Sequence, residues 1–353
     1  MSRQHTRRSV LASIGAASVV TLAGCSGSDD SDGADDADGA GETTPTEPAT
    51  TSISLAVSVY PTAPGSARLL MAREQETFAD HNLEVAEVVS FGSAGDVVRG
   101  ISTGGLDVGL GGLAAPVNAY IQGAPINILG ISLGVNPIEF FARADSGIES
   151  IQDAAGAQIA VSGEGDSPEA AAIQSIRRAD GVSIDDVEFV YAGGLGECLT
   201  TVKQGGADLT WIIPPLSLIQ LDEGDLKRVW RVREYAEWIP PQVITAGTTT
   251  IEERPDVLGR IVSALMDGAE YARNNLEETA SVWAAAAEWP EPLALQTLQN
   301  LDLERHWDPT PRQQYFTNTG ETMIEQGLVD EQPPWQDIIN QTPLPANKQA
   351  DWL

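Results

Sequence analysis

Cysteine, histidine and basic residues are scarce in this sequence. Its 353 residues include 2 Cys and 3 His, and the histidines lie apart at positions 5, 81 and 306. No cluster of metal ligands and no Cys–His nucleophile pair is visible, so neither a catalytic centre nor a cofactor is expected. Only 20 Lys and Arg stand against 51 Asp and Glu, which argues against nucleic acid as a partner because phosphate binding requires basic surfaces.

Aromatic residues are also few, at 6%, but 42% of the residues are hydrophobic. This composition is typical of a folded core rather than a disordered chain. The net charge of -31 places a strongly anionic surface over that core. Molar salt shortens the Debye length to about 3 Å and screens such repulsion, so we expect a halophilic source. Ordinary surface acidity is the alternative interpretation.

The first 28 residues contain no acid and have the pattern of an export signal. The paired arginines of "TRRSVL" precede an apolar run that ends near Val20, which matches a twin-arginine (Tat) signal and is too short for a stable membrane span. "LAGC", from Leu22 to Cys25, resembles the lipobox of exported lipoproteins. We therefore predict a signal peptide over 1–24 and lipidation of Cys25, with the protein anchored to the outer face of the cell membrane.

Residues 25–51 contain eight acids, no base and almost no large apolar side chain. Such a segment cannot bury enough surface to order itself, so we expect an extended tether. The other cysteine, Cys198, has no disulfide partner in the mature chain and is interpreted as a small buried hydrophobe.

From Ile53 onward, β-rich runs alternate with helical stretches. Strands are predicted over 52–60 and 83–91, with a helix over 64–81 between them, and a second series of the same kind begins near residue 146. Alternation of this kind predicts an α/β fold with mostly parallel sheets. Because the chain exceeds the usual size of a single core, two lobes are expected.

One phrase occurs twice at the same spacing: "GDVVRGISTGGLD" from Gly95 and "GECLTTVKQGGAD" from Gly196. Each copy is predicted to form a helix, with Val97, Val98 and Ile101 buried in the first, and each Gly-Gly to supply a positive φ at the helix end. We interpret the repeat as a sign of two similar lobes. A chance echo between βαβ units is the alternative.

The C-terminal third predicts amphipathic helices. One begins at Pro255 and buries Leu258, Ile261, Val262, Leu265 and Ala269, and another covers 313–326. The chain is expected to cross between lobes near 139–147 and 240–247. The predicted organisation is lobe 1 over 52–142 plus 245–331, lobe 2 over 143–244, and a partly ordered tail over 332–353.

Four segments together resemble the type 2 substrate-binding proteins of ABC importers, in the group for nitrate, sulfonates, taurine and the thiamine-precursor pyrimidine. They are "FGSAGDVVRGISTGGLDVGLGGLAAPVNAYIQGAPINILG", "FFARADSGIESIQDAAGAQIAVSGEG", "GECLTTVKQGGADLTWIIPP" and "EERPDVLGRIVSALMDGAEYARNN". The resemblance implies an α/β periplasmic-binding-protein type 2 fold, with two similar Rossmann-like lobes joined by a two-stranded hinge around a central ligand cleft. The stretch Ile213-Pro214-Pro215 departs from the family, which usually has a small or acidic residue before a single proline.

Open α/β sheets bind ligands beyond the carboxyl ends of their strands, where glycine amides and helix N-termini can act as donors. Ser93 and Ser167 could instead cap helices, Tyr60 and Trp211 could be core aromatics, and the acids could be solvated. By position, the ligand-binding candidates are Tyr60, Thr62, Gly92, Ser93, Ala94, Gly112, Leu113, Ala114, Ser162, Glu164, Asp166, Ser167, Trp211, Pro214 and Thr245.

The candidate loops, which include 193–197, contain Glu164, Asp166 and Glu197 but no Arg or Lys. An anionic ligand calls for a cationic or multi-donor pocket, whereas carboxylates favour amines, ring nitrogens and hydroxyls. A small organic anion (sulfonate, taurine or nitrate-like) and a pyrimidine-type ligand therefore both stay open.

The resemblance implies a monomeric binding protein, not an enzyme, that closes on a small molecule and delivers it to an ABC permease and its ATPase. A pyrimidine-biosynthesis-like enzyme of the same fold is one alternative, although the chain lacks that enzyme's clustered Cys and His. A ligand-sensing receptor without transport is the other.

Overall fold

The computed structural model describes residues 50–236 and 238–353, which belong to one compact unit. The predicted signal peptide, Cys25 and the predicted tether up to residue 49 lie outside the described residues. Within the described ranges, no helix has the length and apolarity that crossing a bilayer requires.

The first sheet contains five strands in the order β2-β1-β3-β10-β4. Strand β1 pairs in parallel with β2 and β3, whereas β10 runs antiparallel between β3 and β4. The strands are β1 (Thr51–Ser58), β2 (Leu83–Phe91), β3 (Val108–Gly111), β4 (Ile126–Leu133) and β10 (Gln242–Gly247).

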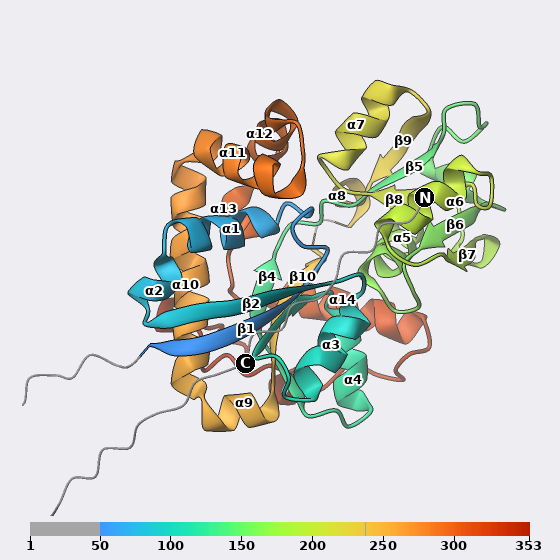
Figure 1. Cartoon of the computed structure of the whole chain (residues 1–353). Helices are drawn as coiled ribbons and strands as arrows, with labels where there is room; N and C mark the ends of the chain where they lie inside the picture. Colours follow the sequence, from blue (N-terminus) through green and yellow to red (C-terminus); the bar gives the residue numbers. More distant parts are fainter. Residues whose placement is uncertain (1–49, 237) are drawn as a thin grey trace, which may run out of the picture. The chain divides into compact units, whose positions relative to one another are not determined.

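The second sheet repeats this arrangement in the order β7-β6-β8-β5-β9, with β5 antiparallel to β8 and β9. In each sheet, the antiparallel strand is formed by a segment that has just crossed from the other lobe. Strand β5 of the second sheet follows β4 of the first sheet in sequence, and β10 of the first sheet follows β9 of the second. This confirms the prediction of two similar α/β lobes, which Figure 1 shows as two sheets with flanking helices. The strands are β5 (Glu139–Arg143), β6 (Gln158–Val161), β7 (Glu188–Tyr191), β8 (Leu209–Ile212) and β9 (Leu226–Arg231).

The two crossings lie earlier in the chain than predicted. Residues 139–143 and 242–247 are buried strands rather than linkers, so the chain passes between the lobes through 134–138 and through the segment that ends at Pro241. The sequence pattern could not distinguish a buried strand from a connection at these positions, since both are apolar and short.

The repeated phrase performs the same structural task in both lobes. It forms α3 (Ala94–Ser102) and α6 (Leu195–Lys203), and Gly104 and Gly205 follow with φ of 72° and 77°, as predicted. The aspartate that ends each copy then binds the first strand of its lobe: Asp107 accepts the backbone N–H of Ser54 at 2.8 Å, and Asp208 accepts that of Gln158 at 2.9 Å. Each copy therefore ties the third strand to the first.

The single helix predicted over 64–81 is wrong, because the chain forms α1 (Ser66–Glu74) and α2 (Thr77–Asp80) with a break between them. Glu76 has a left-handed φ of 56°. The hydroxyl of Thr77 donates to the carbonyl oxygens of Ala72 and Ala264, which fixes the break against α10 (Pro255–Asn274).

The C-terminal helices pack as the pattern predicts. Pro255 begins α10, whose predicted apolar face is buried, and α14 (Gln313–Glu325) lies where a helix was predicted. The tail packs through Ile338 and Leu344, and Ile339 forms a bridge with Ile128 of β4. The other helices are α4 (Ala114–Ile121), α5 (Ser167–Arg178), α7 (Leu216–Glu223), α8 (Val232–Tyr235), α9 (Thr248–Glu253), α11 (Leu276–Ala287), α12 (Glu291–Gln299), α13 (Leu303–His306) and α15 (Trp335–Ile338).

Candidate functional site

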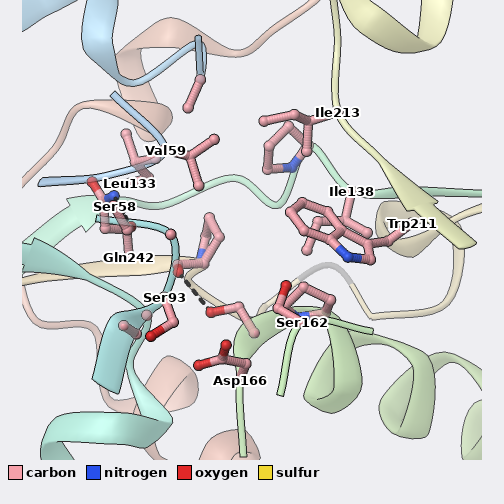
Figure 2. Close-up of a pocket in the computed structure, with 18 residues that line it drawn as sticks. Ser58, Val59, Ser93, Leu133, Ile138, Ser162, Asp166, Trp211, Ile213 and Gln242 are labelled. Carbon is pink, nitrogen blue, oxygen red and sulfur yellow. Dashed lines mark hydrogen bonds between the residues drawn. The ribbon is translucent and has the colours of Figure 1, made fainter. Parts of the chain in front are cut away.

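A cavity of about 90 Å³ lies where residues of both lobes meet the two crossing segments. Figure 2 shows its wall, in which polar groups such as Ser93 and Asp166 face aliphatic and aromatic side chains. The wall consists of Ser58, Val59, Ala63, Gly92, Ser93, Ala94, Gly112, Leu133, Pro137, Ile138, Ser162, Asp166, Ser167, Pro168, Trp211, Ile213, Pro241 and Gln242.

The cavity lies at the carboxyl ends of the parallel strands, where open α/β sheets bind ligands. In the first lobe, Ser58 ends β1, Ser93 precedes α3, and Gly112 follows β3. In the second lobe, Ser162 follows β6 and Asp166 precedes α5. Two helices from different lobes therefore begin at the same cavity.

Eight of the fifteen candidate residues lie in the cavity wall, and seven do not. The eight are Gly92, Ser93, Ala94, Gly112, Ser162, Asp166, Ser167 and Trp211. The seven that lie elsewhere are Tyr60, Thr62, Leu113, Ala114, Glu164, Pro214 and Thr245.

The loop with Tyr60 and Thr62 is held by the C-terminal helices instead. The indole N–H of Trp283 donates to the carbonyl oxygen of Pro61 at 2.9 Å, and that of Trp289 donates to the carbonyl oxygen of Thr62 at 3.3 Å. The ring of Tyr60 packs against the core of the first lobe. This part of the loop therefore braces the neighbouring cavity residues Val59 and Ala63.

The other five candidates also lie outside the cavity wall. Thr245 is 2% exposed, and its hydroxyl donates to the carbonyl oxygen of Gly109 at 3.1 Å inside the sheet. Leu113 and Ala114 line a smaller neighbouring cavity, Pro214 lines another, and Glu164 is exposed.

Ser93, Ser167 and Trp211 each had a structural role as the alternative to ligand binding, and each has both a structural contact and a place in the cavity wall. Ser93 accepts the N–H of Asp96 at 3.2 Å and so caps α3 while it also lines the cavity. Ser167 donates to the carbonyl oxygen of Pro241 at 3.1 Å, which links α5 to the second crossing. Trp211 belongs to the core of the second lobe and also forms part of the wall.

Asp166 is the only ionisable side chain among the cavity-lining residues in the described part of the chain. Burial, together with the charges of Glu169 and Asp96, raises its pKa to about 6, while the backbone N–H of Ala94 acts in the opposite direction. Asp96 and Ala94 belong to the first lobe, whereas Asp166 belongs to the second. Groups of the first lobe therefore contribute to the proton affinity of this carboxyl in the second lobe.

Sequence reasoning missed ten residues of the wall. Two pairs of them lie where the crossings end: Pro137-Ile138 immediately before β5, and Pro241-Gln242, in which Gln242 is the first residue of β10. A proline within two residues of the start of each exchanged strand is the signal that could have found them. The other missed residues are Ser58, Val59, Ala63, Leu133, Pro168 and Ile213.

The described residues contain neither an exposed cysteine nor a group of side chains placed to bind a metal ion. Cys198 is fully buried, as predicted, and burial raises the pKa of its thiol to about 11. Across the described ranges, no group of three or more His, Cys, Asp and Glu side chains is placed to hold a metal ion.

Two mixed sheets that exchange one antiparallel strand each, with a cavity between them, define the two-lobed periplasmic-binding-protein fold. The alkanesulfonate-binding protein SsuA from Xanthomonas axonopodis pv. citri, bound to MOPS, has this fold with a TM-score of 0.69 and 13% identity, over 86% of this chain and 100% of SsuA. The periplasmic aliphatic sulphonate-binding protein SsuA from Escherichia coli gives 0.66 and 16%, over 82% and 92%. The periplasmic nitrate-binding protein NrtA from Synechocystis PCC 6803 gives 0.66 and 14%, over 83% and 87%.

The family model described as "NMT1/THI5 like" matches residues 63–279, which is more than half of the chain. The protein therefore belongs to the NMT1/THI5-like family, and this confirms the resemblance drawn from its sequence segments. No curated protein sequence matches the chain.

Proposed function

We propose that this protein is an extracytoplasmic solute-binding lipoprotein that encloses a small organic molecule between its lobes and presents it to an ABC importer. The observation that carries this proposal is the cavity itself, because its wall combines both lobes with both crossings. A ligand in this cavity contacts both lobes and both crossing segments, so its binding is coupled to closure. The sulfonate- and nitrate-binding proteins of the same fold support a binding role.

The cavity volume supports cleft opening as a part of this function. At about 90 Å³, it is far below the roughly 300–1,000 Å³ of typical small-molecule sites. A ligand of more than a few non-hydrogen atoms therefore requires the lobes to move apart for entry and to settle at a wider separation around it.

A binding role also accounts for the chemistry of the wall better than catalysis does. The wall residues offer hydroxyls, one carboxyl and a tryptophan, but none of them is a histidine, cysteine or lysine that could act as a nucleophile or activate one. The anchor proposed at Cys25 would keep the binding lobes beside the permease. Changing Cys25→Ser tests this part, because the anchored protein should then move from the membrane fraction to the soluble fraction.

The direct test is a thermal-shift screen with taurine, alkanesulfonates, nitrate, aminopyrimidines and aromatic carboxylates at high and low salt. A ligand at a hundred times its dissociation constant should add roughly 2.7 kcal/mol to the free energy of unfolding. The variant Ser162→Leu fills part of the cavity and should abolish the shift. Ser281→Leu on the exposed face of α11 is the matched control. Failure of every compound to shift the wild-type midpoint, or an equal shift in Ser162→Leu, would contradict the proposal.

A further inference from the structure

Arg68, on α1, is a buried cation outside the cavity. It is 2% exposed, and no carboxylate lies within 4.0 Å of its guanidinium among the described residues. Its Nη2 donates to the hydroxyl of Ser132 at 2.8 Å. Although burial lowers the pKa of Arg68, it remains at about 10, so the side chain is charged at neutral pH. A buried charge is costly unless polar groups compensate it.

A chain of hydrogen bonds leads from Arg68 to the cavity. The hydroxyl of Ser132, on β4, donates to Gln242 Oε1 at 2.7 Å, and Gln242 Nε2 donates to Ser58 Oγ at 3.2 Å. Ser132 and Gln242 are buried, whereas Ser58 is half-buried at the end of β1. Both Gln242 and Ser58 belong to the cavity wall.

The direction of this chain follows from the chemistry of its ends. A guanidinium can only donate, so Ser132 accepts from Arg68 and gives its single hydrogen to Gln242. The amide of Gln242 then donates to Ser58, which leaves the Ser58 hydroxyl hydrogen without an acceptor in the described part of the chain. Hydrogen bonds in such a chain polarise one another. Ser58 is therefore a donor that a remote positive charge strengthens.

The position of Ser58 in the cavity fits a ligand with two different ends. Figure 2 shows Ser58 and Gln242 together on one side, while Trp211, Ile138 and Ile213 lie on the other. A hydrogen-bond acceptor of the ligand can lie against Ser58 while its organic part contacts the apolar wall.

We propose that Arg68 sets the specificity of this site from outside it: through Ser132 and Gln242 it makes Ser58 the donor for a carboxylate or sulfonate oxygen of the ligand. The inference rests on the proposed solute-binding function and adds to it the residues that select an anionic oxygen over a neutral one. Arg68 and Ser132 act as positioning residues, since neither reaches the cavity.

The experiment compares matched anionic and neutral probes: acetate with acetamide, benzoate with benzamide, and methanesulfonate with methanesulfonamide. Affinities are measured by calorimetry at neutral pH, in the lowest salt at which circular dichroism shows folded protein. The variants are Ser58→Ala, which removes the donor, and Ser132→Ala, which breaks the chain without touching the cavity. Ser175→Ala is the control, because Ser175 is equally buried but bonds only within α5.

The wild-type protein and Ser175→Ala should bind the anion of at least one pair about tenfold more tightly than its neutral partner, as a charge-assisted bond provides. Ser58→Ala and Ser132→Ala should lose this preference. Equal binding of both members by the wild type, or an equal loss for both in Ser132→Ala, would show a purely structural role and overturn the inference. Binding of aminopyrimidines alone in the thermal-shift screen would also overturn it while leaving the proposed function intact. If no compound of either set binds, the proposed function itself fails.

Discussion

A Cβ atom placed on Gly112, in the first lobe, would lie 2.3 Å from the hydroxyl oxygen of Ser167, in the second. No real Cβ atom makes so short a contact, so this glycine permits the lobes to approach as closely as they do. Its backbone does not adopt a positive φ, and alanine is therefore acceptable there in every respect except the contact with Ser167 and the nearby Ala94.

Gly112→Ala should hold the lobes apart. Each lobe should fold as before, because the new methyl group lies at the cavity and not within a lobe core. The closed state should be depleted, and the affinity for a ligand small enough to be enclosed at the present lobe separation should fall by about tenfold or more, which corresponds to roughly 1.4 kcal/mol. Small-angle X-ray scattering measures the separation of the lobes, and calorimetry measures the affinity.

The double variant Gly112→Ala with Ser167→Ala provides the control for this clash. Removal of the Ser167 hydroxyl removes the 2.3 Å contact, so the double variant should recover the affinity of Ser167→Ala alone. If the double variant binds no better than Gly112→Ala, the contact is not what keeps the lobes open.

Ser167→Ala alone should favour the open state modestly. The hydroxyl of Ser167 donates to the carbonyl oxygen of Pro241 at 3.1 Å and so fastens α5 to the second crossing. A hydrogen bond of this kind contributes about 1 kcal/mol, which is about a fivefold shift in the ratio of closed to open molecules. Energy transfer between dyes on the two lobes measures the ratio. The same substitution at Ser175, which bonds within its own helix, should leave the ratio unchanged.

The sequence predicted best what depends on local chemistry. The two Gly-Gly turns could be anticipated because a positive φ at a helix end favours glycine, and Gly104 and Gly205 both have it. The break at Glu76 could not be anticipated, because its left-handed backbone is carried by a residue that rarely adopts it. It depends on Thr77 and a carbonyl group of α10, far along the chain.

The candidate site also contains residues that could be predicted from the local sequence and residues whose position depends on distant parts of the chain. Residues such as Ser93, Ser162 and Asp166 could be proposed because the ends of parallel strands are known from strand order alone. Thr245 lies outside the cavity wall, and the sequence could not indicate this, since all six residues of β10 are buried and no alternation indicates which side chains face the cavity. Gln242 was missed because its place in the wall depends on how the second crossing returns to the first sheet.

Protonation of Asp166 should stabilise the folded protein. Its pKa is raised to about 6 from 3.8 by burial and by Glu169 and Asp96, so the folded closed state holds a proton that the unfolded chain releases. The stability that this proton contributes is present below about pH 3.8 and is lost as the pH rises through about 6. The largest possible effect is roughly 3 kcal/mol, from about two pKa units.

Asp166→Asn isolates this contribution from that of the many other carboxylates. The variant should be more stable than the wild-type protein at pH 7, and the difference in the free energy of unfolding should shrink as the pH falls to 4. Urea titrations at several pH values measure this difference. A difference that stays constant with pH, or grows toward low pH, would contradict the assignment of the raised pKa.

Replacing either aspartate at the end of the repeated phrase should loosen the first strand of its own lobe, but the two replacements should lower the free energy of unfolding by different amounts. Asp208→Ala removes the acceptor for the N–H of Gln158, and an amide left unpaired costs about 1–3 kcal/mol. Asp107→Ala should cost more, because Asp107 also accepts the hydroxyl of Ser54 at 3.0 Å and pairs with Arg254.

Hydrogen exchange distinguishes the two lobes. In Asp208→Ala, the amide of Gln158 should exchange faster while that of Ser54 keeps its protection, and Asp107→Ala should give the reverse, since each aspartate ties together the strands of its own lobe. Arg254→Ala, which removes the ion pair with Asp107 and the hydrogen bond from Arg254 to the carbonyl oxygen of Ser52, should reproduce part of the extra loss of stability in Asp107→Ala without exposing the Ser54 amide. Exchange that rises at both amides in either variant would mean that the lobes do not hold these strands independently.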